Sequence, residues 1–224
     1  MSTPAFMRHL PYIALVAVAW CVFALSIITP CHAQPIALPD FASDLEAHAW
    51  LRKHSPYYNT MAEEVEKEGA VSYGVLEART GGLVERGSGG RRILLSKELK
   101  GACRLSVQIF ELTNLYQQRQ HDAVDERARS GSIKTPEEFG LLHELIEYDG
   151  LRYHRFVLAE LEAVLEGGIP REMLTWINPE LTNLVSYELP LAFEFVEAQA
   201  KSGHTAHYHE WFWTQKREAP KAAR

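Results

Sequence analysis

KELKGACRLSVQIFELTNLY, at Lys97–Tyr116, is the segment with the strongest structural signal, and it follows a short β-like run, RRILLS, at Arg91–Ser96. On a helical wheel its apolar residues point in nearly every direction and leave no wide polar face. The pattern therefore predicts a central helix that other elements cover on several sides. The apolar residues are Leu99, Ala102, Cys103, Leu105, Val107, Ile109, Phe110, Leu112 and Leu115.

Glu111 is the exception within this helix, because it falls between Val107 and Leu115 in a mostly apolar column. A buried carboxylate without a partner costs several kcal/mol or takes up a proton. We therefore expect Glu111 to have a partner, a metal ion or an opening to water. The plain structural alternative is a core helix with one carboxylate that pairs with a basic or amide group.

The middle of the helix, Phe110-Glu111-Leu112-Thr113-Asn114, resembles the active-site helix of the zincin metallopeptidases. In the zincin motif, HExxH, two His at i and i+4 bind zinc and the Glu beside the first acts as general base. Only the Glu is present here, because Phe110 and Asn114 stand at the two ligand positions. The resemblance covers about Val71–Leu165. It implies a zincin-like fold, with Glu111 as the candidate catalytic residue, far more than it implies zinc hydrolysis.

The N-terminus has the features of an export segment. Arg8 is its one strong base, Leu10–Ile28 is an apolar run, and the small residue Ala33 ends the segment before Gln34. These features predict a signal peptide at residues 1–33, cleaved near Ala33/Gln34. The apolar run is also long enough to suit an uncleaved N-terminal anchor. Both interpretations export the rest of the chain, either to a periplasm or to the medium.

The body of the chain is acidic and has the size of one domain. The 224 residues are 46% hydrophobic and 23% charged, and without residues 1–33 the chain keeps 22 basic and 29 acidic residues. This balance, without a large Lys/Arg cluster, argues against nucleic acid as a partner and against membrane binding beyond the possible anchor. Cys103 is the only cysteine in the body, so no disulfide framework is expected. The expected partner is a protein or peptide of unknown identity.

The predicted body is a single α+β domain at residues 40–216, mainly helical, with a linker at 34–39 and a disordered tail at 217–224. Three short runs with strand character are separated by glycines, and they predict a small antiparallel sheet packed beside the buried central helix. The zincin resemblance implies that the last of the three is the edge strand beside that helix, where a peptide can add to the sheet, although an ordinary three-stranded sheet needs no such role. The runs are Val71–Glu77, Gly81–Glu85 and Arg92–Leu95.

Helices are expected on both sides of this region. The clearest begins at Thr135, which with Pro136 and Glu138 forms a capping box before about 30 residues of helical periodicity. The other expected helices are Asp40–His54, Tyr58–Lys67, Gln117–Arg129, Pro170–Trp176, Asn178–Glu188 and Leu191–Lys201.

His143 and Glu147 lie one turn apart on the long helix, and we expect them to face Glu111 and Asn114. Many zincins take their third zinc ligand from a Glu on a later helix, so the resemblance implies that position for Glu147. The same segment also reads HExxE, a second possible metal motif, although no strand precedes it. A metal-free polar cluster of His143, Glu147 and Glu111 that holds two helices in register is the alternative.

The C-terminal run HTAHYHEWFWTQ, at His204–Gln215, contains three further histidines. His204, His207 and His209 share a helical face poorly, so metal binding would require a loop. The favoured interpretation is an aromatic cover on the core, with its histidines facing solvent. These three residues, together with His143 and Glu147, are weak metal candidates.

Three functions remain open from the sequence. The favoured one is an exported zincin-like domain, derived from a metallopeptidase but catalytically inactive, which acts as a binding or structural module in the envelope and needs no cofactor. The first alternative is a metal-dependent hydrolase that uses zinc with non-standard ligands, with Glu111 polarising a water molecule. The second alternative is a non-enzymatic helical envelope protein unrelated to zincins.

Overall fold

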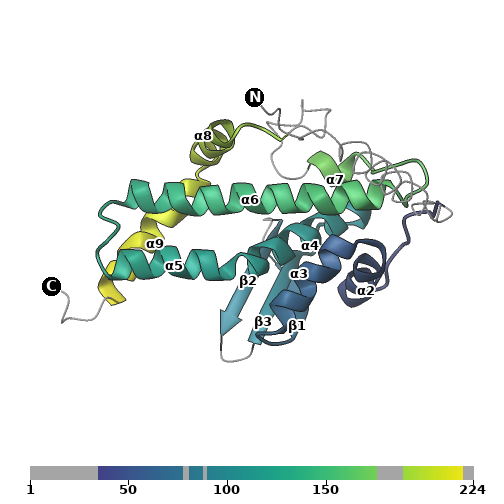
Figure 1. Ribbon diagram of the computed structural model, residues 1–224, viewed down its shortest axis with the longest axis horizontal. Coiled ribbons are helices and arrows are strands. Elements are labelled where there is room, and N and C mark those ends of the chain that lie inside the picture. The colour runs from purple at the N-terminus through teal and green to yellow at the C-terminus, as the bar shows by residue number, and fades with distance from the viewer. Residues whose placement is uncertain (1–34, 78–80, 88–89, 176–188, 219–224) are drawn as a thin grey trace, which may run out of the picture. The chain divides into compact units, whose positions relative to one another are not determined.

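The computed structural model describes residues 35–77, 81–87, 90–175 and 189–218 (Figure 1). Its contacts group the residues from Pro35 onward into one compact unit. None of the described helices combines the length and the hydropathy of a membrane span. The predicted helix at Asn178–Glu188 lies outside the described residues.

The described chain is mainly helical with one small sheet, which confirms the α+β class. The helices before and beside the sheet are α2 (Asp44–His54), α3 (Pro56–Glu66) and α4 (Gly101–Tyr116), and the strands are β1 (Val71–Leu76), β2 (Gly82–Gly87) and β3 (Gly90–Ser96). The later helices are α5 (Gln118–Arg129), α6 (Pro136–Glu162), α7 (Glu172–Thr175), α8 (Ala192–Ser202) and α9 (His204–Glu218).

The sheet has the order β1-β3-β2 and is mixed, so the prediction of an antiparallel sheet is wrong for one of its two pairings. β2 runs antiparallel to β3, but β1 runs parallel to it, with Val71 opposite Arg91. The prediction that the last strand forms the edge is also wrong, because β3 is central. The physical reason is burial: Ile93, Leu94 and Leu95 of β3 are all buried, and the central strand is the most covered one.

α4 is the central helix that its apolar pattern predicts. It packs on β2 and β3, on α3 and on α6, and Figure 1 shows it between the sheet and α6. Val107, Ile109 and Leu115, which point in different directions around α4, are all buried. The helix begins at Gly101, four residues later than predicted, because Lys100 before it has extended backbone angles.

A second apolar cluster joins α5, α6 and α9. Phe139 of α6 and Phe212 of α9 are fully buried in it, with ring centroids 5.6 Å apart. The predicted cap of α6 is confirmed, because the Thr135 side chain accepts a hydrogen bond from the Glu138 amide at 3.2 Å. α9 continues to Glu218, so the first residues of the predicted tail are helical.

The predicted linker at 34–39 is tied to the domain through Ile36 and Leu38, and Leu38 packs against the main apolar core. Ile36 forms a parallel bridge with Leu165, with its amide 2.9 Å from the Val164 carbonyl oxygen. This backbone pairing holds Ile36 next to the residues that follow the C-terminal end of α6.

Gly150 allows α4 and α6 to approach closely. A Cβ atom at this position would lie 2.6 Å from Gln117 Oε1 and 3.0 Å from Thr113 Oγ1. Gln117 is buried and donates to the Ile146 carbonyl oxygen at 2.7 Å, and Thr113 donates to the Phe110 carbonyl oxygen at 2.7 Å. Neither side chain can therefore move without losing a hydrogen bond.

We expect Gly150→Ala to destabilise the protein, although Ala favours a helix by about 1 kcal/mol over Gly. Overpacking at a close contact costs about 1–3 kcal/mol, and the lost hydrogen bond adds to it, so we expect a net loss of about 1–2 kcal/mol. Urea unfolding measures the change. The matched control is Asp149→Ala at the neighbouring half-buried position, where the side chain pairs with Arg152 at the surface, and it should change stability by less than about 0.5 kcal/mol. Equal stability of Gly150→Ala and the parent would contradict the close contact.

Candidate functional site

A cleft of about 470 Å³ opens between the edge strand β2 and helices α4, α5, α6 and α9. It is lined by Phe110, Glu111, Asn114, His143 and Glu147, which are the five residues singled out on the central and the long helix. His204 and His207 of α9 also line it. His209 instead packs on the backbone of α6, where a Cβ atom at Gly140 would lie 3.1 Å from its ring.

Glu111 is buried in the wall of the cleft. Its carboxyl group lies against Gly82 of β2, where a Cβ atom would come within 2.5 Å of Oε1, and Asn114 Nδ2 donates to Oε2 at 3.3 Å. Burial raises the pKa of Glu111 to about 8, and the nearby charge of Glu147 adds to the rise, whereas the Asn114 hydrogen bond and His204 oppose it. Glu111 therefore holds a proton at neutral pH.

The two zincin ligand positions offer little to a metal ion. Phe110 belongs to an apolar cluster with Leu151 and Phe195, and its side chain has no ligand atom. Asn114 donates its amide to Glu111, while its Oδ1 atom has no hydrogen-bond partner among the described residues. An amide oxygen is a poor substitute for an imidazole.

The strongest charge cluster of the site joins α6 to the first turn of α9. His204 Nδ1 lies 3.0 Å from Glu144 Oε1, and His204 Nε2 lies 3.7 Å from Glu147 Oε1. Thr205 Oγ1 donates to Glu144 at 2.8 Å, and the Tyr208 hydroxyl donates to Glu147. The sequence-based expectation that His204 faces solvent is therefore wrong. The segment is helical from His204 onward, so the loop that joint metal binding by the three histidines would require is not formed within α9.

The carboxylates set the protonation of His204. Burial lowers the pKa of His204, but the hydrogen bond to Glu144 and the charges of Glu147, Glu144 and Glu111 outweigh it and raise the pKa to about 9. Burial also raises the pKa of Glu147, against the opposing effects of His204 and of the Tyr208 hydrogen bond. His204 is thus a cation at neutral pH, held between two side chains of α6.

His143 makes a different set of contacts from the expected one. It lines the same cleft as Glu111 and Asn114, but its Nε2 lies 3.2 Å from Asp125 Oδ1 and its Nδ1 lies 2.7 Å from His121 Nδ1. Its ring also stacks on Tyr208, with centroids 4.6 Å apart. Of the expected cluster of His143, Glu147 and Glu111, His143 of α6 thus pairs with His121 and Asp125 of α5 and with Tyr208 of α9, while Glu147 of α6 contacts His204 and Tyr208 of α9.

Tyr208, His121 and Asp125 belong to the site but were not identified from the sequence, and Glu144 was noted only as the second position of the HExxE run. Two of their spacings carry a signal that could have found them. Glu144 and Glu147 are at i and i+3 on a helix, and His121 and Asp125 are at i and i+4, so each pair shares a helical face. Tyr208 carries no such signal, because its contact depends on how α9 packs against α6.

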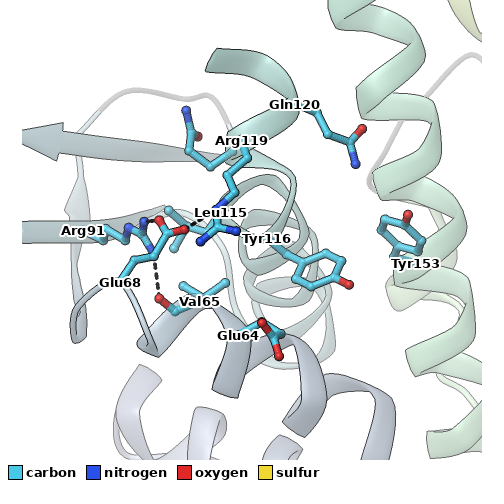
Figure 2. A pocket seen from close by; sticks show the side chains of 10 residues that line it. Glu64, Val65, Glu68, Arg91, Leu115, Tyr116, Arg119, Gln120 and Tyr153 are labelled. Carbon is cyan, nitrogen blue, oxygen red and sulfur yellow. Dashed lines mark hydrogen bonds and ion pairs between the residues drawn. The ribbon is translucent and has the colours of Figure 1, made fainter. Parts of the chain in front are cut away.

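A second pocket lies between α3, the junction of α4 with α5, and α6 (Figure 2). Its two arginines are paired: Arg91 contacts Glu68 and donates to the Val65 carbonyl oxygen at 2.6 Å, and Arg119 donates to Glu68 at 2.6 Å. Tyr116 and Tyr153 face each other beside them, with ring centroids 5.7 Å apart. Because Glu64 and Glu68 together balance the charges of the two arginines, the acidic cleft is the better candidate for a functional site.

Comparison with protein-family models, with curated proteins and with solved structures gave no match to this chain. The site is therefore interpreted from its own geometry and chemistry.

Proposed function

We propose that the chain is an exported, non-catalytic module with a zincin-like fold that binds an extended peptide segment of a partner protein. The observation that carries this proposal is that an edge strand forms the wall of the acidic cleft. β2 pairs with β3 alone in the described sheet, and Gly82, Leu83 and Val84 of β2 line the cleft together with Glu111 and Glu147. A peptide that adds to this strand would pass along the cleft.

Edge strands bind extended peptides through main-chain hydrogen bonds, and neighbouring pockets select the side chains. Here the pocket contains the carboxylate of Glu147, and Glu144 contacts the same histidine, His204. Leu83 has 47% of its surface exposed at the strand, and Trp211 has 40% exposed at the same cleft. The matching partner is a peptide with a basic side chain flanked by apolar residues.

The absence of imidazole at the zincin ligand positions supports a binding role over a catalytic one. Phe110 and Asn114 occupy these positions, and loss of two imidazoles removes most of the zinc affinity of a zincin site. A partner-binding role predicts that Glu111→Gln keeps the function and changes only stability.

The test uses fluorescent nine-residue peptides that alternate Val and Thr around a central Lys or a central Glu. We expect the full chain to bind the Lys peptide at least fivefold more tightly, and methylation of alternate peptide amides to abolish binding. Leu83→Lys should weaken the Lys peptide about tenfold, because it places a like charge beside the bound residue. Fluorescence anisotropy measures each dissociation constant.

Val75→Lys is the matched control for Leu83→Lys. Val75 lies on β1, the other edge strand of the same sheet, and has 57% of its surface exposed. This variant should bind the Lys peptide as the parent does. Absence of binding to both peptides, or an equal loss in the two variants, would refute peptide binding at β2.

The second candidate function is a hydrolase, and the protonation of Glu111 favours it. A general acid or base works best when its pKa lies near the operating pH, and the pKa of Glu111 is raised to about 8. Cleavage of a denatured casein substrate by the full chain, abolished by Glu111→Gln, would support this function. An unchanged substrate after prolonged incubation with added Zn²⁺ would exclude this activity toward casein.

A further inference from the structure

Glu144, Glu147 and His204 converge from two helices that lie far apart in the sequence. Glu144 and Glu147 are one turn apart on α6, and His204 is the first residue of α9. One ligand atom from each of the three lies within 4.8 Å of the other two. In a tetrahedral zinc site with bonds of about 2.1 Å, the ligand atoms are about 3.4 Å apart. His204 reaches the two carboxylates through different ring nitrogens, with Nδ1 3.0 Å from Glu144 Oε1 and Nε2 3.7 Å from Glu147 Oε1, so only one of these two contacts can become a pair of ligand atoms on the same ion.

The Glu144 carboxylate is incompletely satisfied. Its side chain has no exposed surface, Oε1 accepts from His204 and Thr205, and Oε2 has no hydrogen-bond partner among the described residues. A buried oxygen without a partner is unfavourable, and a metal ion is one way to satisfy it. This unpartnered oxygen points to a ligand independently of the clustering of charges.

We propose that Glu144, Glu147 and His204 form a binding site for one divalent transition-metal ion of the Zn²⁺ or Mn²⁺ class. Two carboxylates and one imidazole are a donor set that suits these ions. The site lies on α6 and α9, and it does not use Phe110 or Asn114, the positions at which the zincin resemblance would place ligands.

The surroundings support the ligands and leave room for a further group. Tyr208 donates to Glu147 and Thr205 donates to Glu144, and such hydrogen bonds orient metal-binding carboxylates. Glu147 and His204 line the cleft, so a fourth coordination position faces it. That position can hold water or a carbonyl oxygen of a ligand. The inference does not rest on peptide binding, since the ion needs only residues of this chain.

The test is a titration of the full chain, expressed without a histidine tag, with ZnCl₂ or MnCl₂ in a calorimeter. We expect one ion per chain. His204→Gln and Glu147→Gln should each lower the affinity at least about tenfold, because each removes a ligand. His204→Gln is preferred over Ala because Gln can still donate to Glu144. Cobalt absorption spectra of the parent and of each variant give a second readout of the ligand set.

Glu210→Gln is the control, since Glu210 is on α9 and exposed, and it belongs neither to the cluster nor to the lining of the cleft. This variant should bind the ion as the parent does, and thermal unfolding checks that every variant is folded. No binding by the folded parent would overturn the proposal. Binding that survives His204→Gln and Glu147→Gln, or that is lost in Glu210→Gln, would overturn it as well.

Discussion

Glu111→Gln is expected to stabilise the protein by about 3 kcal/mol at pH 7, and to change its stability little at pH 4. The carboxyl group is only 5% exposed, and its pKa rises from 4.5 to about 8 on folding. Gln has nearly the same shape, can keep a contact with Asn114, and never ionises. Most substitutions in a buried helix destabilise the protein. A gain of this size would therefore be diagnostic of a raised pKa of Glu111 in the folded protein.

The sign follows from the proton that each state holds. Below pH 4.5 Glu111 is protonated in both the folded and the unfolded chain, and the stability linked to its raised pKa is fully present. Between pH 4.5 and 8 the unfolded chain ionises while the folded chain stays protonated, so the parent loses about 1.4 kcal/mol per pH unit from this group. The Gln variant does not lose this stability.

Urea unfolding of parent and variant at pH 4, 5, 6, 7 and 8 gives the free energy of unfolding of each protein as a function of pH. We expect the difference between the two free energies to grow as the pH rises. The control is Glu210→Gln, an exposed carboxylate on α9, whose gap to the parent should stay within about 0.5 kcal/mol. If the unfolding free energies of Glu111→Gln and the parent changed with pH in parallel, Glu111 would be ionised in the folded protein. The site would then carry one more negative charge than described above.

Local signals in the sequence were enough to find the central elements. The apolar residues all round Lys97–Tyr116 required a covered helix, and α4 has that position. Thr135 and Glu138 fixed the start of α6, because a cap is a contact between residues three apart. Glu111 could be singled out because a carboxylate in an apolar column needs an explanation, and it lies in the wall of the cleft.

Long-range pairing was beyond the same reasoning. Strand alternation does not say which neighbour a strand takes, and the parallel pairing of β1 with β3 therefore went unpredicted. The contact between His204 and Glu144 joins residues 60 positions apart, and it depends on the angle at which α9 crosses α6. A helical wheel shows on which face of its own helix His204 lies, but it does not show which other helix packs against that face.

The parent is expected to lose stability in acid because of His154, and the His154→Gln variant is expected not to show this loss. His154 has no exposed surface, and its Nε2 lies 2.8 Å from Ser106 Oγ. Because the Ser106 hydroxyl donates its proton to the Met173 carbonyl oxygen at 2.7 Å, His154 donates to Ser106 and carries its proton on Nε2. Burial first, and the charge of Arg155 second, lower the pKa of His154 to about 3.

Folding therefore keeps His154 neutral where the unfolded chain would protonate it. Above pH 6.5 both states are neutral and the stability linked to this group is fully present. As the pH falls from 6.5 to 5, the unfolded chain gains a proton and the parent loses about 2 kcal/mol, and the loss approaches about 5 kcal/mol at pH 3. Gln does not take up a proton in this pH range. The stability of the His154→Gln variant should therefore fall less steeply in acid than that of the parent, even if the Gln side chain packs less well.

The test compares how steeply the free energy of unfolding falls with pH in the parent and in His154→Gln. Urea unfolding from pH 7 down to pH 4 measures this slope. His207→Gln is the control, because His207 is exposed on α9, and its slope should match that of the parent. A His154→Gln slope equal to that of the parent would mean that the folded protein accommodates the charged ring, and the Ser106 hydrogen bond would then have to be reassigned.

The His154 effect and the Glu111 effect have opposite signs, and together they predict the shape of the pH profile. Between pH 4.5 and 6.5 the two contributions cancel, because each changes by about 1.4 kcal/mol per pH unit in opposite directions. Above this window Glu111 costs stability up to about pH 8, and so does His204, whose pKa rises from 6.5 to about 9 on folding, while below the window His154 costs stability. The His154→Gln variant should thus lose stability between pH 4.5 and 6.5 with no offset from His154, and adding Glu111→Gln should flatten its profile in that range.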